Sequence, residues 1–325
     1  MKEFHIQSND AGQRLDKFLH KAVPLLPTSL MQKYLRLKRI KIDGKRAAGS
    51  DRLVVGSVVS LYISDEFFQE QTVDFRSAPS DLDVVYEDDQ LLIINKQPGL
   101  LVHEGDGHDR DTLIMRILHY LYKKNEYIPD LENSFTPALC NRIDRNTGGL
   151  VIAAKTFEAL QIMNQKIKDR EITKLYLCIV HGVPTQKSAL LKGYHTKDSA
   201  TNTVRISKAP VPGAKTALTS YRVLAVRKDL SLLEIKLLTG RTHQIRAHMA
   251  SIGHPLLGDT KYGVNRMNRD SAFQFQALCA YKLILDFPTD AGPLNYLKGK
   301  SFSLPSVPML EQGGFGGVNL NTPGI

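Results

Sequence analysis

The segment from residue 141 to residue 154 constrains the fold more than any other part of the chain. It ends in the apolar run Val151-Ile-Ala-Ala154, which predicts a buried strand. Just before that strand, one acid, Asp144, lies between Arg142 and Arg145. A buried strand needs a covered sheet, and the 325 residues are enough for a large core and for two domains.

Asp144 is the first candidate for a functional side chain. Opposite charges close by favour the ionised form of a carboxylate, which can then act as a nucleophile or as an electrostatic anchor. The sequence Thr147-Gly148-Gly149 predicts a sharp turn, because glycine bends at little steric cost, and a substrate can then approach closely. The same residues also fit a surface loop whose acid only caps or forms an ion pair.

The charge balance indicates the class of partner. The chain has 43 lysines and arginines against 33 aspartates and glutamates, a formal net charge of +10. This excess points to nucleic acid or to an acidic membrane surface, although basic proteins that bind neither also exist. The first residues lack the apolar core of a signal peptide, and the sequence contains no run of about 18 apolar residues. We therefore expect a cytoplasmic protein with no membrane partner.

Neither the cysteines nor the histidines suggest a metal site. Cys140, Cys178 and Cys279 form no C-x-x-C pair, so we expect small buried side chains rather than disulfides or thiolate ligands. His243 and His248 are five residues apart, off the shared face of a helix, with no glutamate between them. The sequence therefore predicts no bound metal.

Residues 12–75 predict a small α+β domain. Its first helix carries apolar side chains at helical spacing and ends at a pair of prolines. Ser29 followed by Gln32 fits a capping box at the start of a second helix. Strands are expected at residues 53–55 and 57–63. The apolar positions of the two helices are Leu15, Phe18, Leu19, Val23, Leu30, Tyr34, Leu35 and Leu37.

The second helix and the residues after it carry seven cations within fourteen positions, with a single acid among them. A solvated charged face is the ordinary explanation for such a helix, but this proportion of cations favours contact with phosphates. The seven cations are Lys33, Arg36, Lys38, Arg39, Lys41, Lys45 and Arg46.

This N-terminal segment resembles the S-four-like RNA-binding domain, a small unit that is appended to many RNA enzymes. The resemblance supports an RNA partner and leaves the reaction open. The residues that carry it are Gln13-Arg-Leu-Asp-Lys-Phe-Leu19, Ser29-Leu-Met-Gln32, Ile40-Lys-Ile-Asp-Gly-Lys45 and the strand pair that contains Gly56.

A polar stretch at residues 64–81 separates this unit from a second domain at residues 82–310. Residues 84–95 read as two strands around an acidic turn. The pattern predicts a mixed α+β fold, followed by a loosely ordered glycine-rich tail at residues 311–325. Further strands are expected near residues 150–154, 174–181, 217–225 and 231–238, and helices near residues 112–124, 157–169 and 242–252.

Residues 239–259 are a second stretch with functional potential. Thr242 or Gly240 can cap a helix there, and Arg246 lies one turn beyond Thr242. An arginine at this place can form a forked, charge-assisted pair with a carboxylate, which lysine reproduces poorly. The residues expected on the buried side of this helix are Ile245, Met249 and Ile252.

Tyr176 belongs to a third stretch, a short apolar strand at residues 174–180. Most tyrosines in such a place are core residues. An aromatic ring beside a reacting base can instead stack on it, which contributes about 1–3 kcal/mol and helps to hold a nucleotide that has left its helix. The strand alone leaves both interpretations open.

In this order, the motifs resemble the RluA-type pseudouridine synthases of ribosomal RNA, over about residues 82 to 305. The resemblance implies the pseudouridine synthase fold, with a mixed, largely antiparallel central sheet and flanking helices. The motifs that carry it are Val84-Val-Tyr-Glu-Asp-Asp, Asn95-Lys96, Pro98-Gly99-Leu100, Val102-His103, Arg142-Ile-Asp144, Thr147-Gly148-Gly149, Lys174 with Tyr176, Gly240-Arg-Thr-His-Gln-Ile-Arg246, Gly253-His-Pro255 and Gly258-Asp259.

The resemblance also implies a function. It implies an enzyme that isomerises uridine in RNA, first of all in large-subunit ribosomal RNA, by breaking the N1–C1′ bond and joining C5 to C1′. It implies that no cofactor is needed. Asp144 becomes the catalytic acid and Arg246 its ion partner, while Tyr176 stacks on the base and is a candidate for removing the C5 proton. The residues implied at the substrate are Arg142, which fills the space of the flipped nucleotide, Arg241 and His243, which shape the loop or touch phosphate, and Ile245, which packs nearby.

Three positions depart from the family pattern: Asn141 and Cys279 where histidine is usual, and Gly148 where serine is usual. The acid, the aromatic ring and the arginine are all present, so we still expect an enzyme. We also expect it to be monomeric. A transfer RNA substrate and a ribosome-binding factor without catalysis are the alternatives. An RNA methyltransferase is disfavoured, because the sequence has no G-x-G-x-x-G or G-x-x-x-x-G-K-[ST] loop.

Overall fold

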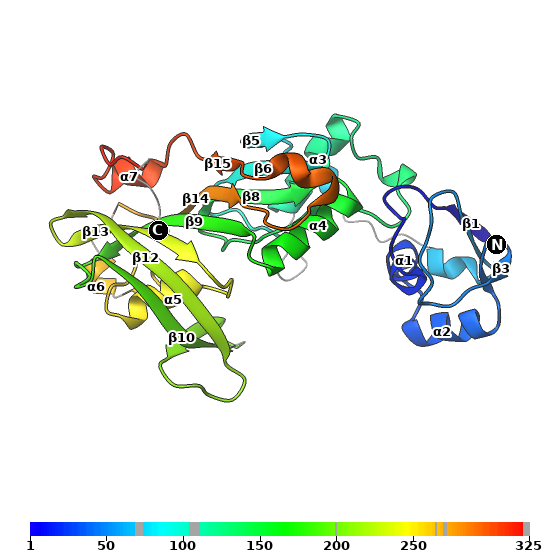
Figure 1. Ribbon diagram of the computed structural model, residues 1–325, viewed down its shortest axis with the longest axis horizontal. Coiled ribbons are helices and arrows are strands. Elements are labelled where there is room, and N and C mark those ends of the chain that lie inside the picture. The colour runs from blue at the N-terminus through cyan, green and yellow to red at the C-terminus, as the bar shows by residue number, and fades with distance from the viewer. Residues whose placement is uncertain (69–73, 104–110, 199, 264, 269–271, 321–325) are drawn as a thin grey trace.

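A computed structural model describes residues 1–68, 74–103, 111–198, 200–263, 265–268 and 272–320. It contains a small N-terminal unit at one end and a long sheet that forms the rest of the molecule (Figure 1). Part of the expected linker and the last five residues of the expected tail lie outside the described residues. In the segments that are described, no helix combines the length and the apolar character needed to cross a bilayer.

The N-terminal unit packs two helices against a four-stranded sheet. Its core is formed by apolar residues from Phe4 to Ile63, which include the expected apolar stripe of the first helix. The strand order in the sheet is β1-β4-β2-β3. The elements are β1 (Lys2–His5), α1 (Leu15–Ala22), α2 (Thr28–Arg36), β2 (Ile40–Ile42), β3 (Lys45–Arg46) and β4 (Val58–Leu61).

Two local expectations for this unit are wrong. The helix α2 starts after Pro27 and has no side-chain cap, so Ser29 lies inside its first turn and forms no capping box. Val54 and Val55 are 65% and 61% exposed and belong to no strand. The strand β4 pairs antiparallel with β1 instead of with a strand at residues 53–55. Since β1 lies before residue 12, the unit begins earlier than the sequence predicts.

The second unit is built on an eleven-stranded sheet with the order β11-β10-β12-β13-β9-β14-β8-β6-β5. Two short strands complete it: β15 pairs with β14, and β7 pairs with β8. The strands β14 and β8 are parallel, whereas the other strand pairs among the described residues of this sheet are antiparallel, which confirms the expected mixed, largely antiparallel sheet. The strands are β5 (Val84–Glu87), β6 (Leu91–Lys96), β7 (Ala138–Leu139), β8 (Gly148–Ala154), β9 (Ile172–His181), β10 (Ser188–Asp198), β11 (Thr203–Ser207), β12 (Lys215–Arg227), β13 (Leu230–Leu237), β14 (Leu278–Leu285) and β15 (Ser301–Ser303).

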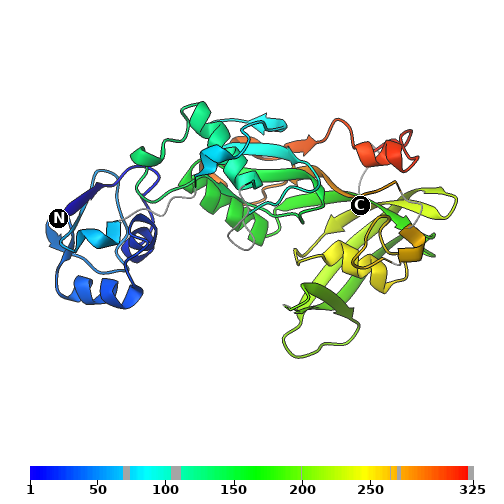
Figure 2. The same cartoon turned by 180° about the vertical axis from the view of Figure 1, so that it is seen from behind.

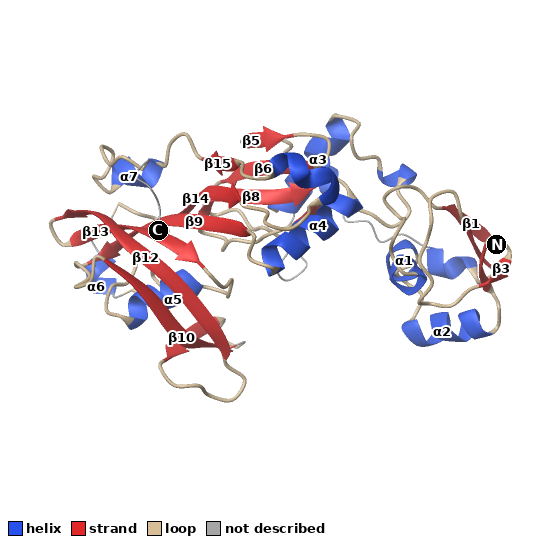
Figure 3. Ribbon diagram, in the orientation of Figure 1, coloured by secondary structure: helices blue, strands red, loops and turns tan. Residues whose placement is uncertain are grey.

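Helices cover both faces of this sheet (Figure 3), and the apolar run in β8 shows why. Leu150 and Ile152 point into one core, whereas Val151 and Ala153 point into the other, because successive side chains of a strand alternate between the two faces. The first core is closed by α4 (Phe157–Lys168), η4 (Gly292–Leu297) and α7 (Pro308–Gln312), and the second by α3 (Leu113–Lys123) and α5 (Gln244–Ser251). The remaining short helices are η1 (Asp65–Phe68), η2 (Phe75–Ser77), η3 (Pro129–Leu131) and α6 (Asn265–Asn268).

The two glycines after Thr147 lie in β8 rather than in a turn, which corrects the sequence expectation. Gly149 has a positive φ of 113°, and a Cβ atom at this position would lie 2.2 Å from the carbonyl oxygen of Ala280. Glycine is therefore required so that β14 can pair closely with β8. The turn itself comes earlier, where the backbone N–H of Thr147 donates to the carbonyl of Asp144.

The C-terminal tail is partly packed, which is a further correction. Phe315 is buried in the same core as α4, next to Leu310 just before the tail, and the guanidinium of Arg227 donates to the carbonyl of Gly314. An aromatic side chain within the glycine-rich sequence is enough to anchor it, because a buried ring removes a large apolar area from water. Ile252, which was expected to be buried on α5, is 38% exposed.

Polar contacts join the two units where the chain after β1 meets the loop before β7 (Figure 2). Asp10 is almost fully buried and accepts hydrogen bonds from Asn133 and Ser134, each of 2.7 Å. The ammonium group of Lys21 on α1 lies 4.7 Å from the ring centroid of Phe157 at the start of α4. These contacts give the N-terminal unit a defined position against the sheet.

Candidate active site

Asp144 lies in the loop between β7 and β8, and its side chain is 23% exposed. Its ion partner is Arg246, with 3.6 Å between Oδ2 of the acid and Nη1 of the arginine. Arg142 and Arg145 were expected to lie close to the carboxylate of Asp144, and neither forms an ion pair with it among the described residues. Arg142 is exposed, and Nε of Arg145 donates to the carbonyl of Gly99. Adjacent positions in an extended loop point in different directions, so closeness in sequence did not produce an ion pair.

A second acid, Asp259, fixes the orientation of Arg246. Nε and Nη2 of the arginine donate to its two carboxylate oxygens at 2.7 and 2.9 Å, and Asp259 is completely buried. The forked pair expected for Arg246 therefore exists, but with Asp259. Burial opposes the charged form of both groups, but the hydrogen bonds and the opposite charge of the partner have the larger effect. The pKa of Arg246 is therefore raised and that of Asp259 is lowered. The remaining nitrogen, Nη1, is left to face Asp144.

The turn before α5 places Arg246 in the first helical turn. His243 is the N-cap residue in a left-handed conformation with φ of 51°, and no side chain caps the helix, so the expected cap at Thr242 or Gly240 is wrong. The side chain of Gln244 organises the turn instead. It accepts from Thr239 and from the backbone of Arg241, and it donates to the Leu218 carbonyl and to Thr219.

Tyr262 connects the loop residues to Arg246. The guanidinium carbon of Arg246 lies 5.1 Å from the centroid of its ring, at cation–π distance. Its hydroxyl is 2.8 Å from Nδ1 of His243 and accepts from the backbone N–H of Val204. Burial lowers the pKa of His243, while the charge of Asp144 opposes that shift. His243 therefore lies near Asp144, and burial favours the neutral form of its imidazole ring.

Tyr176 lies in the middle of the sheet, in β9, between Ile235 of β13 and Ala280 of β14. It is buried and shares the second core with Ile245 of α5. Burial raises the pKa of Tyr176 well above its ordinary value, and the charge of Asp144 raises it further. The phenol is therefore neutral, and it lies close enough to Asp144 to feel that charge.

Lys96, at the end of β6, supports the loop that carries Asp144. Its side chain is buried, and Nζ donates to the carbonyls of Gln97, Leu100 and Arg145 at 2.8 to 2.9 Å. Burial lowers the pKa of this lysine to about 7, and the nearby charge of Asp144 opposes the shift. One ammonium group thus joins two loops directly beside the acid.

The three departures from the family pattern have local structural explanations. Asn141 accepts a hydrogen bond from the backbone of Ile152 and so ties the loop to β8. A Cβ atom at Gly148 would lie 3.2 Å from the ring of Pro98, so the loop after β6 packs tightly against this position. Cys279 is buried and lies near Lys96. Among the described residues, none of these three side chains forms a hydrogen bond or an ion pair with Asp144 or Arg246.

The seven expected RNA-binding cations all lie on α2, β2, β3 or the turn between them. Six of them are exposed, and Lys41 is half-buried. Lys41 and Arg39 lie over the rings of Tyr62 and Tyr34 at 5.3 and 5.5 Å. Among the ion pairs of the described residues, none involves any of the seven cations. Their charges are therefore free to meet phosphates.

The structure thus brings Asp144, Tyr176, Arg246 and His243 together, with Ile245 packed behind them. It leaves Arg142 and Arg241 exposed at the edge, where Arg241 lies 3.5 Å from the carbonyl of Thr216. Within the described ranges, no group of three or more His, Cys, Asp or Glu residues is arranged to hold a metal ion. Sequence reasoning assigned no role to three residues of the site, although two of them lie in motifs that it quoted: Lys96, Asp259 and Tyr262.

Comparison with known proteins shows the family of the chain. The family model described as RNA pseudouridylate synthase matches residues 90–251. An RNA pseudouridine synthase of Mycoplasma genitalium is 31% identical over 290 residues, which cover 87% of this chain and 88% of the relative. The ribosomal large subunit pseudouridine synthase D of Yersinia pestis is 34% identical over 260 residues, 79% of this chain and 75% of the relative.

The fold is shared as well. The solved structure of the human protein RNA Pseudouridylate Synthase Domain Containing 1 superposes with a TM-score of 0.52 at 24% identity, over 75% of this chain and 96% of that one. The family match and the curated relatives identify the chain as an RNA-modifying isomerase. The chain belongs to the RNA pseudouridylate synthase family.

Proposed function

We propose that this pseudouridine synthase converts uridine to pseudouridine in large-subunit ribosomal RNA, with Asp144 as the catalytic acid. The single observation that carries the catalytic assignment is the geometry of Arg246, which is fixed by buried Asp259 and presents Nη1 to the partly exposed carboxylate at 3.6 Å. The ribosomal substrate is supported by relatives that are named ribosomal large subunit pseudouridine synthase D.

The reaction exchanges one glycosidic bond for another. The N1–C1′ bond breaks, the C5–C1′ bond forms, C5 loses its hydrogen as a proton, and N1 gains a proton. An oriented carboxylate can add to C1′, add to the pyrimidine ring or remove the C2′ proton, and each route needs a charged oxygen that is held in place. Arg246 supplies that orientation for Asp144 in all three routes.

The target uridine must leave its helix to reach Asp144, which costs a few kcal/mol of lost stacking. We assign the stacking role to Tyr176, since a ring next to the acid can offset part of this cost. Proton removal from C5 is a less suitable role, because burial and Asp144 both keep the phenol protonated. Arg142 is exposed beside the loop and is assigned to the space that the nucleotide vacates.

The seven cations of the N-terminal unit are assigned to the phosphates of the same RNA. Their exposure and their lack of ion pairs in the described part of the chain support this role. Arg241 and His243 are assigned to the loop that faces the substrate. We further propose that the enzyme works as a cytoplasmic monomer.

Mapping of modified ribosomal RNA tests the proposal. Carbodiimide treatment followed by reverse transcription marks each pseudouridine as a stop. Ribosomal RNA from deletion cells and from cells that carry Asp144→Asn should lose the same stop, and wild-type protein should restore it. A stop that persists with Asp144→Asn refutes the catalytic role of this acid.

Two other functions lead to different results. If transfer RNA is the substrate, purified enzyme modifies transfer RNA and leaves ribosomal RNA unmodified in vitro. If the protein is a ribosome-binding factor, Asp144→Asn fully rescues the deletion phenotype. The basic N-terminal unit is compatible with either function, so the site geometry is what favours the enzyme.

A further inference from the structure

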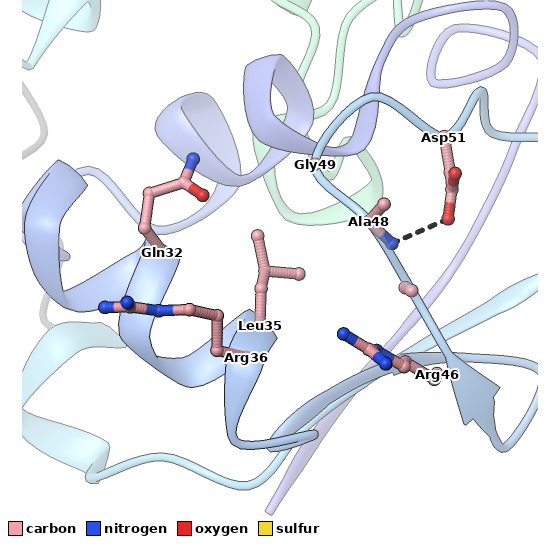
Figure 4. Close-up of a pocket in the computed structure, with 8 residues that line it drawn as sticks. Gln32, Leu35, Arg36, Arg46, Ala48, Gly49 and Asp51 are labelled. Atoms are coloured by element: carbon pink, nitrogen blue, oxygen red, sulfur yellow. Dashed lines mark hydrogen bonds between the residues drawn. The ribbon is translucent and has the colours of Figure 1, made fainter.

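The N-terminal unit contains a cavity of about 360 Å³ between α2 and the loop that follows β3. Gln32 and Leu35 of α2 face Ala48 across it (Figure 4). Its size lies within the roughly 300–1,000 Å³ that is typical of sites for small organic groups. Contact with a regular duplex requires only a flat basic surface, so such contact does not explain the cavity.

The lining combines an apolar floor with two guanidinium groups. Leu35, Ala47 and Gly49 provide apolar contact, and Arg36 and Arg46 lie on opposite sides of the cavity, one on the helix and one on the strand. Neither arginine forms an ion pair among the described residues. Apolar surface beside free guanidinium groups matches the face of a nucleobase and the phosphates on either side of it.

The wall opposite α2 is held by hydrogen bonds. The carboxylate of Asp51 accepts from the backbone N–H of Ala48 at 2.7 Å, as the dashed line in Figure 4 shows. The backbone of α1 also bonds to this loop, since the N–H groups of Leu15 and Asp16 donate to the carbonyls of Asp51 and Gly49 at 2.8 and 2.9 Å. A site that is already formed does not lose binding free energy to the ordering of its own loop.

We propose that this cavity binds one unpaired nucleotide of the RNA substrate, at a place separate from the uridine that reacts at Asp144. The base enters between Leu35 and the loop at residues 47–49, and Arg36 and Arg46 bind the adjoining phosphates. The inference rests on the proposed function because it takes RNA as the ligand. It adds that the N-terminal unit selects RNA with a bulged or looped-out nucleotide over regular duplex.

The test measures binding of the full-length protein to two RNA duplexes, each annealed from two strands that contain no uridine, so isomerisation cannot occur and no terminal loop is present. One duplex carries a single bulged adenosine, and the other is fully paired and otherwise identical. We expect fluorescence anisotropy to give a dissociation constant about tenfold lower for the bulged duplex, as expected from the stacking of one base. Equal dissociation constants for the two duplexes overturn the proposal.

Two substitutions connect the preference to the cavity. Ala48→Leu fills the cavity from an exposed position without changing the charge, and it should reduce the preference to less than about twofold. Arg36→Ala should reduce it by about threefold or more. Lys33→Ala is the matched control: it removes an exposed cation from the same helix outside the cavity, so both duplexes should bind more weakly with an unchanged ratio.

A preference that survives both Ala48→Leu and Arg36→Ala overturns the proposal, because the bulge is then bound elsewhere. Circular dichroism of each variant shows that the domain is folded. The outcome is independent of the mapping experiment on ribosomal RNA, since the duplexes offer no target uridine. A clear preference together with an unmodified ribosomal RNA would support the cavity and reject the ribosomal substrate.

Discussion

Asp259 holds Arg246 by two hydrogen bonds, of 2.7 and 2.9 Å, in a place that water does not reach. Two backbone N–H groups, from Lys261 and Tyr262, also donate to the carboxylate of Asp259. Its charge is therefore fully compensated inside the protein. The arginine that faces Asp144 is thus positioned by a residue that has no need to touch the substrate.

Asp259→Ala should destabilise the protein, because it leaves the buried charge of Arg246 without its partner. We expect the free energy of unfolding to fall by about 3–5 kcal/mol, measured by urea denaturation. Asp259→Asn keeps the shape and part of the hydrogen bonding and should cost less. A loss below about 1 kcal/mol for Asp259→Ala would show that the pair does not hold this part of the structure.

Arg246→Lys keeps a positive charge near Asp144 but cannot reproduce the fork to Asp259. We expect kcat to fall on the order of 10²-fold, with a smaller change in KM, because a compact ammonium group cannot bind both acids in this geometry. RNA with tritium at C5 of uridine measures the rate, since C5 loses its hydrogen in the reaction. Wild-type kcat in Arg246→Lys would reduce the role of Arg246 to charge alone.

Tyr176 can be tested for stacking against proton transfer with two substitutions. Tyr176→Phe keeps the ring and should retain kcat within about fivefold, whereas Tyr176→Ala should lower kcat/KM by about 10- to 100-fold through lost stacking. The same tritium assay applies. If the hydroxyl removes the C5 proton, Tyr176→Phe will be as damaging as Tyr176→Ala.

Lys96 predicts a pH dependence of stability. Burial lowers its pKa to about 7 from 10.5, so the unfolded chain binds a proton between these values that the folded chain does not bind. The free energy of unfolding should therefore rise with pH across this window, by up to about 1.4 kcal/mol per pH unit. Urea denaturation of wild type and Lys96→Met at pH 6, 7.5 and 9 isolates this contribution. A constant difference between the two proteins would show that the three carbonyls keep the lysine protonated.

Asp10 and Ser134 should be coupled across the two units of the molecule. A double-mutant cycle of Asp10→Ala and Ser134→Ala should give an interaction free energy of about 1.5–3 kcal/mol, as for a hydrogen bond to a charged group. The control cycle pairs Ser134→Ala with Asp65→Ala, which removes an exposed acid of the N-terminal unit, and should be additive. Additivity in both cycles would mean that the units are not fixed to one another through this contact.

Sequence reasoning succeeded where periodicity or motif order is strong. The apolar run after Asp144 predicted a buried strand, and the stretch at residues 157–169 predicted a helix, because hydrophobic burial alone sets these patterns. The strands β10 and β11 were not predicted. Much of this hairpin is exposed or half-buried, including Ser188, Lys192, Lys197 and Arg205, so its apolar signal is weak.

The partners of the site residues could not be read from the sequence. Asp144 was placed with its neighbours Arg142 and Arg145, yet it pairs with an arginine 102 positions later in the chain. Such contacts depend on the tertiary fold, because Arg246 reaches the loop of Asp144 only when α5 is packed against β9 in the shared core. For the same reason the role of Lys96 appeared only when its three carbonyl partners were in place.

The position of β14 in the sheet has a consequence for the order of events during protein synthesis. This strand lies between β8, which follows Asp144, and β9, which carries Tyr176, although it is made more than 120 residues after β8. The strands β8 and β9 are joined in the sheet only through β14, so the sheet beneath the proposed site cannot be complete before residues 278–285 have been made. We therefore expect no uridine isomerisation by a nascent chain that lacks β14, even though its N-terminal unit is already made.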